Sequence, residues 1–182
     1  MHYSLFLLPF IAISQAIPLA PRQDSQALAP QLLEQIRSLN TAVTQLTTAV
    51  NNYDGSLFGV LPQGIAVISA EKKVDSLVSK ATETAQDSSK FTAPDSKEVV
   101  QTLATQIGPI KDSLSALKTK YPAFKRTFTA PIVLKDLKTL KEHTGELIAA
   151  VKEKVTAEDA GLLDFGKGIL DQAFDDAIGV YS

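Results

Sequence analysis

The chain has 182 residues, a formal net charge of −2 and no cysteine. The near-neutral balance argues against nucleic acid as the main partner, and a chain without cysteine must be held together by packing rather than by disulfides. About 150 structured residues suffice for a single buried core.

Residues 1–16 are predicted to be a secretory signal peptide. An apolar run over 5–13 is followed by Ser14 and Ala16, small residues three and one positions before a cleavage point. This layout is typical of secretory signals, and the run is too short to span a bilayer stably. Residues 17–29, rich in Pro, Ala and Gln, are predicted to be a disordered leader or pro-segment. We therefore expect a secreted, extracellular protein.

No second hydrophobic span follows the leader, so we expect no transmembrane segment. Residues 175–182 also lack the apolar tail that a GPI signal requires. Association with a cell wall would therefore have to arise without a GPI anchor. The folded domain is expected to cover residues 30–182.

The first folded segment has the clearest pattern. That pattern is an apolar series whose spacings alternate between four and three: Leu32, Ile36, Leu39, Val43, Leu46, Val50 and Tyr53. This is the period of a helix face that packs against partner helices. Pro30 suits a first helical turn and the Asp54-Gly55 pair stops the helix, which predicts a helix from about 30 to 52.

An unusually apolar loop over 55–62 leads into a second helix, expected from about 63 to 86. Its expected inner face is Ile65, Ile68, Val74, Leu77, Val78 and Ala81. A third helix is expected from about 95 to its end before Pro122. The Gly108-Pro109 pair should kink it, because proline removes a backbone donor and crowds the preceding turn. We expect a gap between helices at that kink.

A fourth helix is predicted over about 131–154, and Thr156 is predicted to cap a fifth. Residues 121–155 carry seven Lys or Arg and four acids, whereas 156–182 carry six acids and one lysine. This contrast predicts two neighbouring helices with complementary surfaces. All five helices are amphipathic and joined by short connections. The predicted fold class is therefore all-α, a single-domain antiparallel bundle of about five amphipathic helices.

The residues that usually carry catalysis are missing or misplaced. His143 lies near Glu142 and Glu146, but no His-Glu-x-x-His or Glu-x-x-His pattern is present, and a catalytic zinc needs about three protein ligands. Ser56 stands in the wrong place for a Gly-x-Ser-x-Gly nucleophile elbow, and no strand precedes it. We expect His143 to lie on a solvated helix surface, and we expect no metal, no cofactor and no enzyme activity.

Several helical segments resemble the fungal hydrophobic surface-binding protein A and cell wall mannoprotein family. The resemblance spans roughly 31–182 and is carried by residues 39–50, 61–77, 80–85, 118–124 and 174–181. It implies a secreted or wall-associated fungal protein with a helical-bundle fold. Family members adsorb to hydrophobic surfaces, where one can help recruit a polyester-degrading enzyme, and others hold fatty acids in a tunnel between helices. Mannoproteins of the family often carry a Ser/Thr-rich stalk and a GPI signal, which this chain lacks.

The first functional hypothesis is a non-enzymatic protein that holds a long-chain fatty acid or similar lipid between its helices. Such a ligand needs an apolar tunnel with a few polar groups at its mouth. The alternative for each apolar residue is ordinary core, since every bundle needs such a face. The candidate tunnel residues, with two serines as polar candidates, are Ile65, Ile68, Ser69, Ser76, Leu77, Leu103, Ile107, Leu137, Leu140, Leu170 and Phe174.

The second hypothesis is a surface-active protein that adsorbs to a hydrophobic polymer surface or cell wall and recruits a partner such as a secreted hydrolase. Its candidate patch is the apolar loop, with Leu57, Phe58, Val60 and Leu61. The alternative is a loop folded over one end of the core. A third hypothesis is a secreted effector that sequesters a host lipid, and no feature of the sequence separates it from the first.

Overall fold

The computed structural model describes residues 27–56 and 58–182. The predicted signal peptide, the leader up to residue 26 and Leu57 lie outside these residues. Every regular element in the described part is a helix, which confirms the all-α prediction. The helices are α1 (Ala29–Asn52), α2 (Val60–Asp87), α3 (Ala93–Ala104), α4 (Ile107–Arg126), α5 (Ala130–Lys152) and α6 (Ala157–Tyr181).

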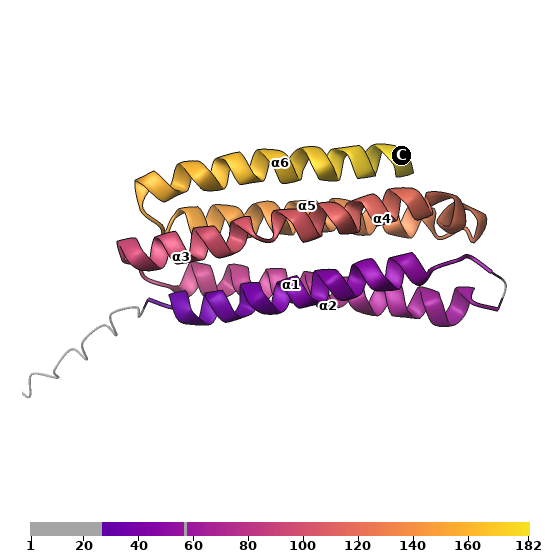
Figure 1. Ribbon diagram of the computed structural model, residues 1–182, viewed down its shortest axis with the longest axis horizontal. Helices are drawn as coiled ribbons and strands as arrows, with labels where there is room; N and C mark the ends of the chain where they lie inside the picture. Colours follow the sequence, from indigo (N-terminus) through magenta and orange to yellow (C-terminus); the bar gives the residue numbers. More distant parts are fainter. Residues whose placement is uncertain (1–26, 57) are drawn as a thin grey trace, which may run out of the picture.

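The six helices form five rods, because α3 and α4 follow one another along one line (Figure 1). Consecutive rods run in opposite directions, as predicted. In space, however, the rods follow a different order: α2 packs on α1, α1 on the α3–α4 rod, that rod on α6, α6 on α5, and α5 on α2. Five cylinders of about 10 Å diameter in a closed ring leave a central channel roughly 3.5 Å in radius. Side chains must therefore fill or line the centre.

The predicted inner face of α1 is confirmed, since every residue in the alternating series from Leu32 to Tyr53 is buried. The inner face of α2 differs from the prediction. Its buried apolar residues are Val67, Val74, Val78, Ala81 and Ala85, while Ile65 and Ile68 are exposed and Leu77 is half-buried. In the ring α2 packs mainly against α1 and α5, so it buries only a narrow stripe.

The third rod is interrupted rather than kinked. The predicted kink at Gly108-Pro109 is replaced by a break at Thr105 and Gln106, which leaves Pro109 in the first turn of α4. A proline is tolerated there, because the first amides of a helix have no intrahelical acceptor. The expected end before Pro122 is wrong, since α4 continues to Arg126. Pro122 has no N–H to donate to the carbonyl four residues before it. Because Pro122 is exposed, that carbonyl lies on the solvent side of the helix.

The last two helices complement each other in charge, as predicted. Lys141 of α5 pairs with Asp175 of α6, and Lys152 pairs with Asp164 at 2.7 Å. The predicted cap is also present, because the Thr156 hydroxyl accepts a hydrogen bond from the backbone N–H of Asp159. These contacts fix α6 along α5 and place its apolar face toward the centre of the ring.

Candidate functional site

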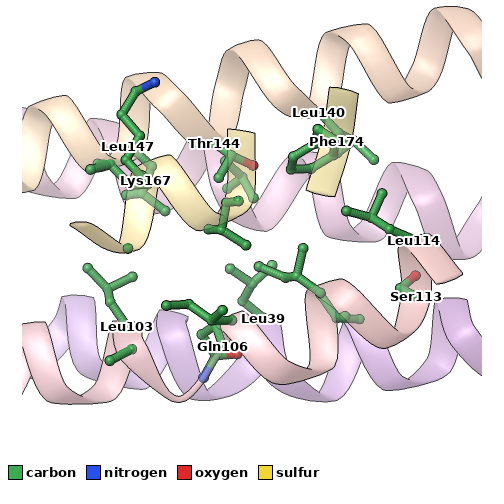
Figure 2. Close-up of a pocket in the computed structure, with 18 of the residues that line it drawn as sticks. Leu39, Leu103, Gln106, Ser113, Leu114, Leu140, Thr144, Leu147, Lys167 and Phe174 are labelled. Atoms are coloured by element: carbon green, nitrogen blue, oxygen red, sulfur yellow. The ribbon is translucent and has the colours of Figure 1, made fainter. Parts of the chain in front are cut away.

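A cavity of about 290 Å³ occupies the centre of the ring. All six helices contribute to its wall, which is almost wholly apolar. Figure 2 shows Gln106 and Ser113 on the wall formed by the third rod, opposite Leu140 and Thr144 of α5. The volume lies at the lower edge of the range of about 300–1,000 Å³ that is usual for small-molecule sites.

Six of the predicted tunnel residues lie together on this wall: Leu103, Ile107, Leu137, Leu140, Leu170 and Phe174. The wall does not include the other α2 candidates Ile65, Ser69, Ser76 and Leu77, which corrects their placement. The part of α2 that faces the cavity is its buried stripe, with Val74 and Val78. Ile68 lines a second, smaller pocket instead.

Sequence reasoning left out a large part of the cavity wall. Leu39, Val43 and Leu46 of α1 line it, although the α1 face had been identified as an inward face. Ile110 and Leu114 of α4 line it too. Their spacing could have found them, since each continues an inward helical stripe.

One end of the bundle is closed by aromatic side chains. The ring of Tyr53 stacks on that of Phe124 with centroids 4.3 Å apart, and the Tyr53 hydroxyl lies 2.7 Å from the Thr127 hydroxyl. The phenol of Tyr181 donates to the carbonyl of Leu117 at 2.7 Å. Burial raises the pKa of this phenol, so it stays a donor at every physiological pH. These contacts tie α1, α4 and α6 together at this end.

A second pocket of about 60 Å³ lies between α2 and α5 toward this closed end. It shares four wall residues with the central cavity, namely Leu46, Leu117, Leu137 and Leu140. A single layer of leucine side chains therefore stands between the two spaces.

The central cavity opens beside the break in the third rod. Leu162 and Phe165 of α6 line it while remaining 60% and 72% exposed. The helices do not need glycine at this point. A Cβ at Gly166 of α6 would lie 3.4 Å from the Cδ1 atom of Ile107, and one at Gly145 of α5 would lie 3.7 Å from Cε of Lys167, both ordinary van der Waals contacts.

Among the described lining residues, Lys167 alone is charged. Its side chain is 40% exposed and pairs with Asp171 one turn along α6. Figure 2 shows its amino group extended away from the middle of the cavity, toward α5. A ligand carboxylate could approach this cation only at the rim.

Two polar side chains of the wall are deeply buried. Gln106 and Ser113 are each 4% exposed. The Gln106 amide nitrogen donates to the Thr102 carbonyl at 3.3 Å and to the Thr105 hydroxyl at 3.0 Å. Gln106 Oε1 and Ser113 Oγ have no hydrogen-bond partner among the described residues.

The apolar loop predicted as a surface patch is only partly exposed. Phe58 and Leu61 are 91% and 74% exposed, whereas Val60 packs against the core; Leu57 lies outside the described residues. The α4–α5 turn touches this loop, because Arg126 donates to the Asp54 carbonyl at 2.7 Å. That turn adds Phe128, which is 88% exposed and has a backbone φ of 60°.

A group of ionisable residues lies on α2 and α5 beside the second pocket. Nδ1 of His143 lies 2.6 Å from Oδ1 of Asp75, and this hydrogen bond raises the pKa of His143. His143 is therefore paired rather than fully solvated as expected. Burial, with Asp136 and Asp75 nearby, raises the pKa of Glu71 to about 7.

None of the sequence features considered for catalysis forms a recognisable centre in the described residues. They contain no group of three or more His, Cys, Asp or Glu side chains placed to hold a metal ion. The Ser56 hydroxyl accepts from the Gly59 amide at 3.0 Å, so it stabilises the loop. In the same part of the chain, no helix has the length and apolar character needed to cross a membrane.

The sequence and the helical bundle are similar to those of known proteins. The family described as Hydrophobic surface binding protein A matches residues 29–153. No protein with a curated description matches the sequence. The crystal structure of AFMP4P in complex with palmitic acid is similar with a TM-score of 0.81 and 30% identity, covering 85% of this chain and 99% of that one.

Two further solved structures share the fold at lower identity. Ligand binding domain 1 of the Penicillium marneffei MP1 protein, complexed with arachidonic acids, has a TM-score of 0.74 and 15% identity, covering 82% of this chain and 95% of that one. Domain 2 of the same protein, complexed with multiple arachidonic acids, has a TM-score of 0.73 and 14% identity, covering 85% and 94%. By its family match and its similarity to AFMP4P, this chain belongs to the hydrophobic surface binding protein A family.

Proposed function

We propose that this protein is a non-enzymatic carrier that holds the acyl chain of a fatty acid or similar lipid in its central cavity. The observation that carries the proposal is an apolar cavity lined by all six helices, with the exposed side chains of Leu162 and Phe165 at its mouth. The palmitic acid bound to AFMP4P supports it. A secreted protein working outside the cell is part of the same proposal and follows from the predicted signal peptide.

The acyl chain would enter beside Leu162 and Phe165 and direct its methyl end toward Tyr53 and Phe124. Burying about 15 methylenes at ~0.8 kcal/mol each contributes on the order of 12 kcal/mol before association costs. After those costs, a dissociation constant between micromolar and nanomolar is expected. The shared leucine layer gives a longer chain a route into the second pocket.

Native mass spectrometry of protein from a eukaryotic secretory host, followed by organic extraction, tests this proposal. We expect a stoichiometric added mass that is released as fatty acid or another lipid. Ile110→Trp should fill the cavity and abolish binding, whereas Ile178→Trp should not. Both isoleucines are half-buried against the core, but only Ile110 lines the cavity. A bare protein that also ignores added fatty acids would contradict the proposal.

Adsorption to a hydrophobic surface is a second candidate function, favoured by the apolar end of the bundle. Exposed apolar side chains lie in the α1–α2 loop (Phe58), in the first turn of α2 (Leu61) and in the α4–α5 turn (Phe128). The two connections are linked by the hydrogen bond from Arg126 to the Asp54 carbonyl. Such a cluster can insert into a polymer surface while the bundle stays folded. A bound hydrolase or cell-wall partner would belong to this function.

Adsorption to polystyrene or wax particles distinguishes the second candidate from the first. The double variant Phe58→Ser, Phe128→Ser should adsorb less and bind fatty acid unchanged. Phe165→Ser, at the cavity mouth, is the matched control and should adsorb as the parent protein does. Equal adsorption by all three proteins would remove this end of the bundle as the adsorbing surface.

A further inference from the structure

We propose that the cavity selects ligands whose chain carries an uncharged O–H group, which donates a hydrogen bond to Gln106 and has a second polar site at Ser113. The ligand class is a long-chain alcohol, a hydroxylated fatty acid or a protonated carboxylic acid. This inference rests on the proposed lipid-binding function and specifies the polar part of the ligand.

The atom of the Gln106 side chain that is free to bind a ligand is the acceptor Oε1. Its amide nitrogen must face the Thr102 carbonyl, because a carbonyl oxygen can only accept. The orientation of the amide is therefore fixed by its surroundings, and Oε1 is the free atom. At 4% exposure this oxygen has little access to bulk water, and a buried acceptor without a donor destabilises the protein.

Ser113 differs from several threonines in helix interiors. Thr47, Thr82 and Thr119 each donate to the carbonyl four residues before them, at 2.9 to 3.0 Å. Thr82 is buried to a similar degree and is satisfied in this way. Ser113 is as buried, and its hydroxyl makes no such bond. It remains available to a group inside the cavity that it lines.

The charge around the cavity argues for an O–H group rather than a carboxylate at Gln106. A carboxylate has no hydrogen to donate, so it would place two acceptors against each other at Gln106. Lys167 is held at the rim by Asp171 and does not compensate a buried negative charge. An alcohol or a neutral acid avoids both penalties.

The two polar positions are distinct. Gln106 and Ser113 are seven residues apart, which is two helical turns or about 10 Å along the axis of α4. A single oxygen therefore satisfies one of them, and a chain with two oxygen functions about 10 Å apart satisfies both. A fatty acid hydroxylated near the middle of its chain is the simplest ligand of this kind.

Displacement of a fluorescent fatty acid by four competitors tests the inference: methyl palmitate, palmitic acid, cetyl alcohol and ω-hydroxypalmitic acid. We expect cetyl alcohol and ω-hydroxypalmitic acid to bind about tenfold more tightly than methyl palmitate, which has no donor. Gln106→Met and Ser113→Ala should each reduce that preference, measured as the ratio of the alcohol affinity to the methyl palmitate affinity in the same variant. Binding of methyl palmitate also shows that these variants are folded.

Gln35→Met is the matched control. Gln35 is also buried with an unpartnered Oε1, but it does not line the cavity, so its variant should keep the preference. Tighter binding of palmitic acid as the pH falls from about 8 to about 5 would identify the neutral acid as a source of the O–H group. An unchanged affinity, with the alcohol preference intact, would identify the alcohol.

Two negative results are distinguishable. If the parent protein binds all four competitors equally, or if Gln106→Met and Ser113→Ala keep the preference, the inference is overturned and lipid binding stands. If none of the four displaces the fluorescent probe and no lipid is extracted from the protein, the proposed function itself fails.

Discussion

The closed end of the bundle and the cavity mouth are built in opposite ways. At the closed end, Tyr53, Phe124 and Tyr181 stack and hydrogen-bond across three helices. At the mouth, on the side of the bundle between the broken third rod and α6, Leu162 and Phe165 remain exposed beside the cavity. Exposed side chains at the mouth let these helices separate locally without unfolding the domain.

This difference shows how a bundle without disulfides can keep a cavity. Packing at the closed end, and at the opposite end around Leu32, Val99 and Val151, holds the ring together. The mouth can therefore leave apolar surface exposed and buried polar atoms unsatisfied. The unpartnered Gln106 and Ser113 atoms both lie in the third rod, at or just after its break. Stability and binding are thereby separated along the length of the molecule.

Replacing one aromatic residue at the closed end and one at the mouth tests this separation most severely. Phe124→Ala should lower the free energy of unfolding by about 3–5 kcal/mol, because it removes a buried ring and its stack on Tyr53. Phe165→Ala should change it by less than about 0.5 kcal/mol, since that ring is 72% exposed. Urea denaturation of both variants gives the values, and equal losses would refute the division.

Much of the fold could be predicted from periodicity, because an inward helix face leaves a regular trace in the sequence. The α1 series from Leu32 to Tyr53 is buried throughout. For α2 the apolar residues are spread around the helix, and Ile65 competes with Val67 for the inward position. Only the neighbours of α2 in the ring decide between them, and the sequence does not specify those neighbours.

The sequence predicts part of the apolar wall of the candidate site, but it does not predict the polar atoms. Leu103, Leu137 and Phe174 follow from helical stripes. Ser69 and Ser76 were selected as polar candidates by their place on α2, yet both face solvent. Whether a serine is satisfied depends on its rotamer and on the carbonyl four residues before it, so nothing in the sequence distinguishes Ser113 from them.

The ionisable group near the closed end makes that end sensitive to pH. The pKa of Glu71 is about 7 in the folded protein, against 4.5 for the free side chain. The folded state therefore binds this proton more tightly, and the resulting stability is present below pH 4.5 and lost as the pH rises through 7. The raised pKa of His143 acts in the same direction.

Glu71→Gln should remove most of the pH dependence between about 4.5 and 7, a change of about 1 kcal/mol after solvent screening. Thermal unfolding across this range measures it. Glu83→Gln, at an exposed position on the same helix, is the control and should leave the pH profile unaltered. A parent protein whose stability rises between these pH values would contradict the assignment.

At the open side of the comparison, Ser113→Ala should stabilise the ligand-free protein by about 1 kcal/mol. The substitution removes a buried hydroxyl that has no partner and keeps the Cβ that packs in α4. Thr82→Ala provides the contrast, because its hydroxyl already bonds to the Val78 carbonyl at 2.9 Å. Urea denaturation of ligand-free protein should therefore show opposite signs for the two variants, and a destabilised Ser113→Ala would mean that the hydroxyl is already satisfied.

The smallest expected effect concerns the exposed turn at the closed end. Phe128 adopts a φ of 60°, a conformation that glycine reaches without steric cost. Phe128→Gly should stabilise the fold by about 0.5 kcal/mol, since relief of backbone strain is partly offset by the greater freedom of glycine in the unfolded chain.

The same variant should adsorb less to wax particles, because the side chain is 88% exposed. Measuring unfolding and adsorption on this one variant therefore separates the two roles: a gain in stability with a loss of adsorption supports a surface-binding turn, whereas a loss of stability would show that the ring packs against the closed end.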